Sequence, residues 1–171
     1  MAKLQPPVSA KDQRTGHPDA SIILVEFGDY QCPHCGHAHP LIKKLLAEKG
    51  DEILFVFRNF PLQETHPAAF MAALAAEAAG KQGKFWPMHD LIFENQANLN
   101  AHLFLDLAEK LELDLRQFGT DWKSPETVKK VEADFESGIR SGVNGTPTFF
   151  LNGERLVYDE TYESLLYAVH S

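Results

Sequence analysis

The sequence predicts an α/β fold in which a β-α-β unit and a C-terminal β-hairpin with a helix are separated by an all-helical insertion. Three observations lead to this prediction. Two apolar, β-branched runs flank a helical pattern in the first third of the chain. A long middle region shows only helical periodicity, and a hairpin signal returns near the C-terminal end.

The β-α-β unit follows an N-terminal segment, residues 1–19, whose prolines and scattered charges predict irregular structure. Ile22–Phe27 is a nearly continuous apolar run, typical of a strand buried on both faces. His34–Glu48 has an apolar stripe at helical spacing and predicts a helix, which Pro40 should kink. Ile53–Phe60, rich in Ile, Phe and Val, predicts a second strand that pairs in parallel with the first.

The helical insertion is expected over residues 63–142, where no strand pattern is evident. Alanine is dense in Ala68–Ala79, directly after a proline. Ser124-Pro125 predicts the start of a further helix, with Val131 and Ile139 on its apolar face.

A hairpin and a last helix are expected at the C-terminal end. Thr148–Leu151 and Glu154–Tyr158 have strand composition, and Asn152-Gly153 between them is the strongest two-residue hairpin signal. Apolar residues from Tyr162 to Val169 then recur at helical spacing. The sheet is therefore expected to be mixed, with an antiparallel hairpin.

Composition limits the classes of function. The 171 residues are 44% hydrophobic and carry a formal charge of -8, without a dense basic run. Such a chain is expected to form one domain with a real core, and to bind neither nucleic acid nor a membrane. The N-terminal end has no signal-peptide pattern, which predicts a cytoplasmic protein, or a periplasmic one if a signal or lipoprotein anchor has been lost.

The two cysteines form a single motif, Cys32-Pro33-His34-Cys35. Random placement would give this spacing roughly once in ninety cases, so the pairing has a chemical reason. At a strand-to-helix junction the first sulfur lies beside unpaired N–H groups and the positive end of the helix dipole, which favours the thiolate. Pro33 stiffens the first turn, and His34 is expected to add a charge or a donor near the Cys32 sulfur. The motif predicts a thiol-disulfide redox centre.

A zinc-binding module that uses the same cysteines is the alternative. Structural zinc sites need a second cysteine pair or a pair of histidines elsewhere, and the chain has no second cysteine pair. Cys35 and His39 share a helix face, but His37 and His39 are expected to be helix-surface residues. The sequence therefore predicts neither a metal site nor a cofactor.

A second marker is Gly145-Thr146-Pro147-Thr148-Phe149, in which a proline directly precedes a strand. Together with the Cys32–Cys35 motif after a strand ending in Glu26-Phe27, it resembles the DsbA-like branch of the thioredoxin superfamily, in its short bacterial form. The resemblance covers residues 20–171 as one domain. It implies a thioredoxin-like core, residues 20–62 and 143–171, around the insertion.

The resemblance also assigns roles to residues. It implies that Cys32 is the exposed nucleophile and Cys35 the resolving thiol. Pro147 would be a cis proline facing the disulfide, with the Thr146 backbone free to pair with an extended substrate. Glu26 matches a buried acid of the family, and strand alternation independently places it on the face of Leu24. A desolvated carboxyl there could shuttle the proton of the resolving thiol.

The predicted function is exchange of disulfides with protein thiols or small thiols such as glutathione, with an unidentified redox partner for recycling. The direction, oxidase or reductase, stays open because the partner and the compartment set it. A glutathione-dependent isomerase or transferase of the same fold is an alternative, but such relatives usually have serine at the position of Cys32. Larger family members carry a lysine on the strand after the first helix, which accompanies the buried acid. This sequence departs from that pattern, because the predicted strand Ile53–Phe60 offers only Arg58 as a partner for the charge of Glu26.

Overall fold

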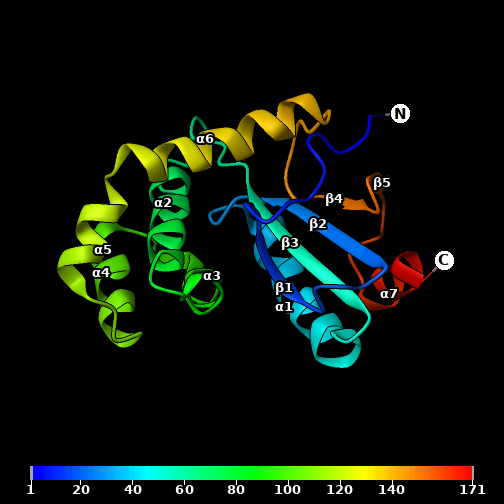
Figure 1. Ribbon diagram of the computed structural model, residues 1–171, viewed down its shortest axis with the longest axis horizontal. Coiled ribbons are helices and arrows are strands. Elements are labelled where there is room, and N and C mark those ends of the chain that lie inside the picture. Colours follow the sequence, from blue (N-terminus) through cyan, green and yellow to red (C-terminus); the bar gives the residue numbers. More distant parts are fainter. Residues whose placement is uncertain (1, 171) are drawn as a thin grey trace.

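A computed structural model describes residues 2–170 of the protein; Met1 and Ser171, the ends of the expected segments 1–19 and 20–171, lie outside the described residues. Within that range one mixed sheet has the strand order β1-β3-β2-β4-β5 (Figure 1). The strands are β1 (Gln13–Gly16), β2 (Ile22–Gly28), β3 (Ile53–Asn59), β4 (Thr148–Leu151) and β5 (Glu154–Leu156). The helices are α1 (Pro33–Lys49), α2 (Ala69–Gly80), α3 (Phe85–Glu94), α4 (Ala101–Lys110), α5 (Leu115–Trp122), α6 (Pro125–Arg140) and α7 (Tyr162–His170), with a 3₁₀ turn η1 (Gln96–Asn98).

The predicted β-α-β unit is confirmed. β2 and β3 pair in parallel, from Ile22 opposite Ile53 to Gly28 opposite Asn59, and α1 forms the crossover between them. β4 pairs antiparallel with β2, and β4 and β5 form the predicted hairpin. The turn residues Asn152 and Gly153 both have positive φ, 48° and 87°, which is the reason that Asn-Gly favours this turn.

The N-terminal segment is a correction to the sequence prediction. Residues 13–16 are not irregular but form β1, which pairs antiparallel with β3, with Gln13 opposite Phe57. No apolar alternation marks this strand, because it lies at the sheet edge and owes its conformation to hydrogen bonds with β3. α1 continues as one helix through Pro40.

The sheet separates two apolar cores. One contains Leu24, Phe55 and Phe57 and extends to α1 and to the helices of the insertion, including α3. The other, on the opposite face, contains Val25, Phe27, Leu54, Val56, Phe60 and Phe150. Alternate residues of β2 and β3 therefore face different cores, which is why both strands are apolar along their whole length.

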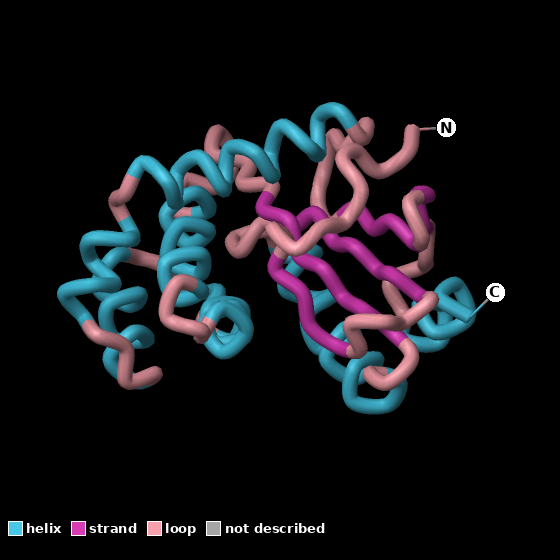
Figure 2. Tube along the Cα trace, viewed as in Figure 1, coloured by secondary structure: helices cyan, strands magenta, loops and turns pink. Residues whose placement is uncertain are grey.

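The insertion packs beside the sheet as the predicted helical layer. Figure 1 and Figure 2 show α2–α5 grouped on one side, while α6 runs from that group across to the sheet. Ser124 caps α6 by accepting a hydrogen bond from the Thr127 N–H, as its position predicts. Val131 is buried, but Ile139, expected on the same face, is 55% exposed, because α6 there extends past the insertion helices.

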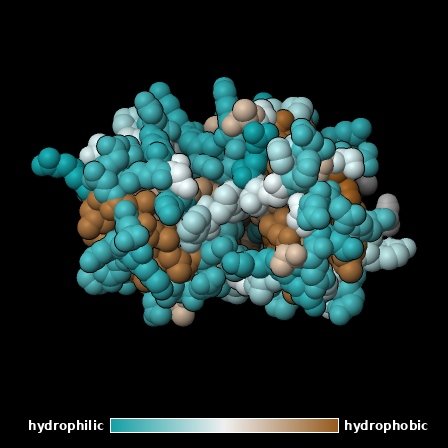
Figure 3. Space-filling view, turned by 60° about the horizontal axis from the view of Figure 1, so that its bottom comes forward, coloured by the Kyte–Doolittle hydropathy of each residue, from teal (hydrophilic) through white to brown (hydrophobic). Residues whose placement is uncertain are grey.

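The surface mixes polar and apolar groups. In the face shown in Figure 3, hydrophilic side chains separate several apolar areas. The exposed large apolar side chains include Leu105 on α4 and Leu115 on α5. Among the described residues, no helix is long and apolar enough to cross a membrane.

Candidate active site

The two cysteines lie where the sequence predicts, at the start of α1. Cys32 is the N-cap residue, Pro33 occupies the first turn, and Cys35 lies one turn into the helix. Both carry free thiols. Cys35 is fully buried and Cys32 is 5% exposed, so Cys32 is the more accessible of the two sulfurs but is less open than the expected exposed nucleophile.

Cys32 is an acidic thiol, with a pKa lowered from 9.0 to about 5. The largest cause is a hydrogen bond from the Cys35 side chain, which stabilises the Cys32 thiolate. The Thr146 side chain and the backbone N–H groups at the start of α1 lower this pKa further, while partial burial opposes them. At neutral pH the first sulfur is therefore the anionic, attacking form.

Cys35 has the opposite environment. Burial raises its pKa well above 9.0, and its hydrogen bond to Cys32 adds to the effect. Its sulfur accepts one long hydrogen bond from the Asp29 N–H, at 3.5 Å. The pair is thus divided into a thiolate and a protonated thiol, the arrangement that an attacking and a resolving cysteine require.

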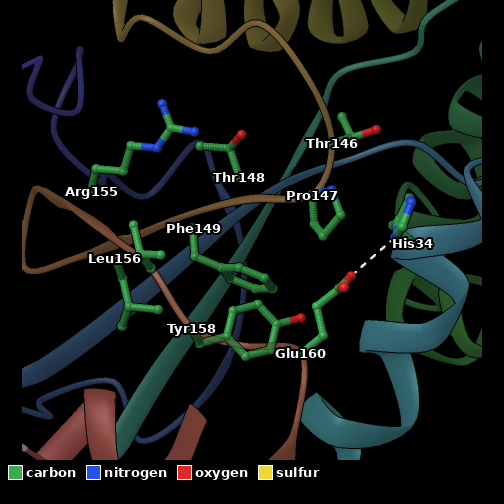
Figure 4. A pocket seen from close by; sticks show the side chains of 10 residues that line it. His34, Thr146, Pro147, Thr148, Phe149, Arg155, Leu156, Tyr158 and Glu160 are labelled. Carbon is green, nitrogen blue, oxygen red and sulfur yellow. Dashed lines mark hydrogen bonds and ion pairs between the residues drawn. The ribbon is translucent and has the colours of Figure 1, made fainter. Parts of the chain in front are cut away.

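The predicted cis peptide bond is present between Thr146 and Pro147, and it faces the thiols. The carbonyl oxygen of Thr146 lies 3.5 Å from Cys32 Sγ. A pocket beside this loop is lined by residues of α1, the loop, β4, β5 and the segment after β5: His34, Thr146, Pro147, Thr148, Phe149, Arg155, Leu156, Val157, Tyr158 and Glu160 (Figure 4). An extended chain in this pocket would lie beside the Thr146 backbone.

The side chain of His34 is exposed, and its Nδ1 lies 3.0 Å from Glu160 Oε1, on the far wall of the pocket (Figure 4). Its backbone N–H is the group that faces Cys32. In the first turn of a helix a backbone N–H points along the helix axis, which allows this contact.

Glu26 is buried as predicted, at 3% exposure, in the middle of β2. Burial is the main cause that raises its pKa from 4.5 to about 8, and the charge of Cys32 raises it further. Among the described residues, its Oε2 has no hydrogen-bond partner. Its charge also raises the pKa of Cys35, which places the carboxyl within electrostatic reach of the resolving thiol.

Arg58 is not the partner of Glu26. Its guanidinium forms a buried bidentate pair with Asp12, at 2.8 and 3.0 Å, and also donates to Ser137. Strand register explains this outcome, because Arg58 lies opposite Phe27 and Glu26 lies opposite Phe57, so the two side chains point to different faces.

Gln96 is a site residue that sequence reasoning missed. Its Nε2 donates to the carbonyl oxygens of Tyr30 and Cys32, at 2.9 and 2.8 Å, and so ties the insertion to the active-site turn. A Cβ at Gly36 would overlap Gln96 Oε1, so a residue larger than glycine would have to displace this side chain. The glycine directly after the second cysteine was the available signal.

His39 is a correction. It was expected on the helix surface, but it is 8% exposed and stacks on Phe93, with ring centroids 4.9 Å apart. α3 of the insertion covers this face of α1 and therefore buries it. His37 is exposed, as predicted, and its Nε2 bonds the Glu160 carbonyl oxygen at 2.9 Å.

The sequence model of the thioredoxin family matches residues 9–171, nearly the whole chain. The protein belongs to the thioredoxin family. Its structural neighbours are DsbA-like thiol-disulfide oxidoreductases, the family that the motifs resemble.

Two solved structures are similar to this chain over nearly its whole length. The thioredoxin-like oxidoreductase from Silicibacter pomeroyi DSS-3 is 27% identical, with a TM-score of 0.82, and the match covers 95% of this chain and 92% of that one. BdbD from Bacillus subtilis is 25% identical, with a TM-score of 0.85, and the match covers 99% and 96%.

Curated relatives have a different name. The chain is 41% identical over 161 residues to the Na(+)/H(+) antiporter NhaA 1 of Salinispora arenicola, and 40% identical over 154 residues to an antiporter NhaA of Herminiimonas arsenicoxydans. In both cases the matched region covers at least 90% of this chain and 24% of the antiporter. This thioredoxin-family chain thus spans about a quarter of the length of the curated relatives that it matches.

Proposed function

We propose that this protein exchanges disulfides with cysteine-containing proteins, and that its disulfide accepts electrons from substrate thiols. The observation that carries the proposal is the division of the two sulfurs into an acidic Cys32 and a buried, protonated Cys35. A couple with a stabilised thiolate favours its reduced form, so the disulfide is oxidising. The pocket along the Thr146-Pro147 loop supports an extended polypeptide as the substrate.

In the oxidising direction a substrate thiolate attacks Cys32 Sγ, a substrate–Cys32 disulfide forms, and the Cys32–Cys35 bond breaks. Cys35 leaves as a thiolate and takes up a proton, for which the protonated Glu26 is the nearby acid. A second substrate thiolate then attacks the substrate sulfur, and Cys32 leaves as a stable thiolate. The substrate has lost two electrons to the cysteine pair, which a redox partner must reoxidise.

The compartment decides how the couple is used. In a compartment buffered by reduced glutathione, an oxidising couple would rest mainly in its reduced form. In an oxidising compartment the same site would introduce disulfides. The transport named for the curated relatives is said of whole proteins four times as long as the matched segment, and we propose thiol exchange for this chain because its own residues form a redox site.

The test is the redox equilibrium of Cys32 and Cys35 with glutathione, combined with turnover on a reduced protein substrate. We expect full exchange, a couple more oxidising than glutathione, and loss of turnover in Cys32→Ser. In Cys35→Ser the Cys32 thiolate should attack oxidised glutathione, release one glutathione thiolate and remain as a Cys32–glutathione disulfide, because the resolving thiol is missing. A pair that never exchanges with glutathione, or that binds zinc in place of forming a disulfide, contradicts the proposal.

A further inference from the structure

Three potential metal ligands meet between α1 and α3, separate from the two thiols. They are His39 of α1 and the neighbouring His89 and Asp90 of α3. One ligand atom of each lies within 4.8 Å of the other two. The cluster is asymmetric in burial, since both histidines are buried and Asp90 is 30% exposed at its side chain.

His39 provides the second observation. Its Nε2 is completely buried and has no hydrogen-bond partner among the described residues, although Asp90 Oδ1 lies only 3.5 Å away. A buried nitrogen without a partner costs free energy, and native proteins rarely leave one unsatisfied. The imidazole is aimed at the carboxylate and held there by stacking on Phe93. The missing partner therefore belongs in the space between these side chains.

The spacing fits a cation in that space. Zn²⁺ binds imidazole nitrogen and carboxylate oxygen at about 2.0 to 2.2 Å, so two ligands of a tetrahedral ion lie about 3.4 Å apart. The His39 Nε2 to Asp90 Oδ1 distance is 3.5 Å, close to that value. The ligand atom of His89 lies within 4.8 Å of the other two, so a small movement of this side chain would bring it to the same ion. Three protein ligands leave a fourth position for water at the exposed side of Asp90.

Neighbouring groups orient the ligands. The Tyr30 hydroxyl hydrogen-bonds His89 Nδ1 at 2.7 Å and fixes the plane of that ring. Lys43 Nζ donates to Asp90 Oδ2 at 3.0 Å, and so leaves the other carboxylate oxygen, Oδ1, directed toward His39. Such outer contacts commonly orient metal ligands. Lys43 is half exposed, so its charge can move into solvent when a cation binds.

We propose that His39, His89 and Asp90 form a binding site for one divalent transition-metal ion of the zinc class. Two imidazoles and one carboxylate suit Zn²⁺ better than the all-oxygen cations Ca²⁺ and Mg²⁺. The site joins the helix that carries the redox thiols to the helical insertion. A bound ion fastens these two parts of the protein together, independently of the proposed thiol exchange.

The experiment measures Zn²⁺ binding to the oxidised protein, in which a Cys32–Cys35 disulfide removes both thiolates as competing ligands. A Cys32→Ser/Cys35→Ser variant serves the same purpose. We expect one equivalent of Zn²⁺ by titration calorimetry and by metal analysis after dialysis. Co²⁺ in its place should give a visible spectrum of a nitrogen and oxygen site without sulfur-to-metal absorption.

Asp90→Asn is the main variant, because Asp90 is partly exposed and the amide keeps its size. We expect at least a tenfold loss of Zn²⁺ affinity, with an unchanged circular dichroism spectrum, and the same loss in His39→Gln. The matched control is His102→Gln/Asp106→Asn, an exposed pair on α4 with a similar spacing of 3.4 Å and no third ligand. No binding by the thiol-free protein, binding that Asp90→Asn retains, or binding that the α4 variant loses would overturn the proposal.

Discussion

The pH dependence of stability provides a direct test of the environment of Glu26. Its folded-state pKa of about 8 lies above the ordinary value of 4.5. Between these values the unfolded chain has released the proton while the folded protein keeps it, so stability falls as the pH rises. The stabilising contribution is complete below pH 4.5 and is lost as the pH rises through about 8.

The magnitude follows from the size of the pKa change. One pKa unit corresponds to about 1.4 kcal/mol, so the rise from 4.5 to about 8 destabilises the folded state by about 5 kcal/mol above pH 8 and by about 3 kcal/mol at pH 7. Glu26→Gln keeps the shape of the side chain and removes the titration. Relative to this variant, the wild type should lose about 1.4 kcal/mol per pH unit between pH 5 and pH 8.

Urea unfolding of both proteins under reducing conditions, at pH 5, 6, 7 and 8, measures the difference. The test is how the difference in unfolding free energy between the two proteins changes with pH. The buried amide of the variant adds a cost, but that cost does not change with pH. Glu109→Gln, on the exposed surface of α4, controls for the loss of one negative charge. A difference between wild type and Glu26→Gln that is constant from pH 5 to pH 8 would refute the reasoning. The same variant should slow the release of Cys35 from the Cys32–Cys35 disulfide by at least about tenfold.

Three further substitutions test the structure around the thiols and the buried ion pair. Thr146→Val should raise the pH midpoint of Cys32 alkylation from about 5 toward the value of an ordinary thiol, and an unchanged midpoint would show that the hydroxyl does not stabilise the thiolate. Gly36→Ala should displace Gln96 and destabilise the protein by about 1 to 3 kcal/mol in urea unfolding, with Cys32 more reactive; full stability would contradict the close approach. Arg58→Ala should cost about 3 to 5 kcal/mol, because it leaves a buried carboxylate without its partner, and a loss below 1 kcal/mol would argue against that pair.

Local patterns were sufficient for most of the fold. A signal within a few consecutive residues marks the strands β2 and β3, the helix α1, the cap at Ser124 and the Asn152-Gly153 turn, and each was predicted. β1 was missed because a four-residue edge strand is stabilised by its neighbour and not by its own composition.

The candidate site also has features that the local sequence predicted and features that depend on distant parts of the chain. The sequence by itself predicted the redox chemistry, because two cysteines one turn apart at a helix start can form a disulfide and place the first sulfur beside unpaired N–H groups. The burial of Cys35 and the contact of Cys32 with Thr146 came from the tertiary structure. Only the tertiary structure decided where His34 points, what covers His39 and which residue supports the active-site turn. Glu160, α3 and Gln96 each reach α1 or its start from far along the chain, and no local periodicity records such contacts. Their positions depend on how the insertion and the C-terminal segment pack on the sheet, which is a property of the whole folded chain.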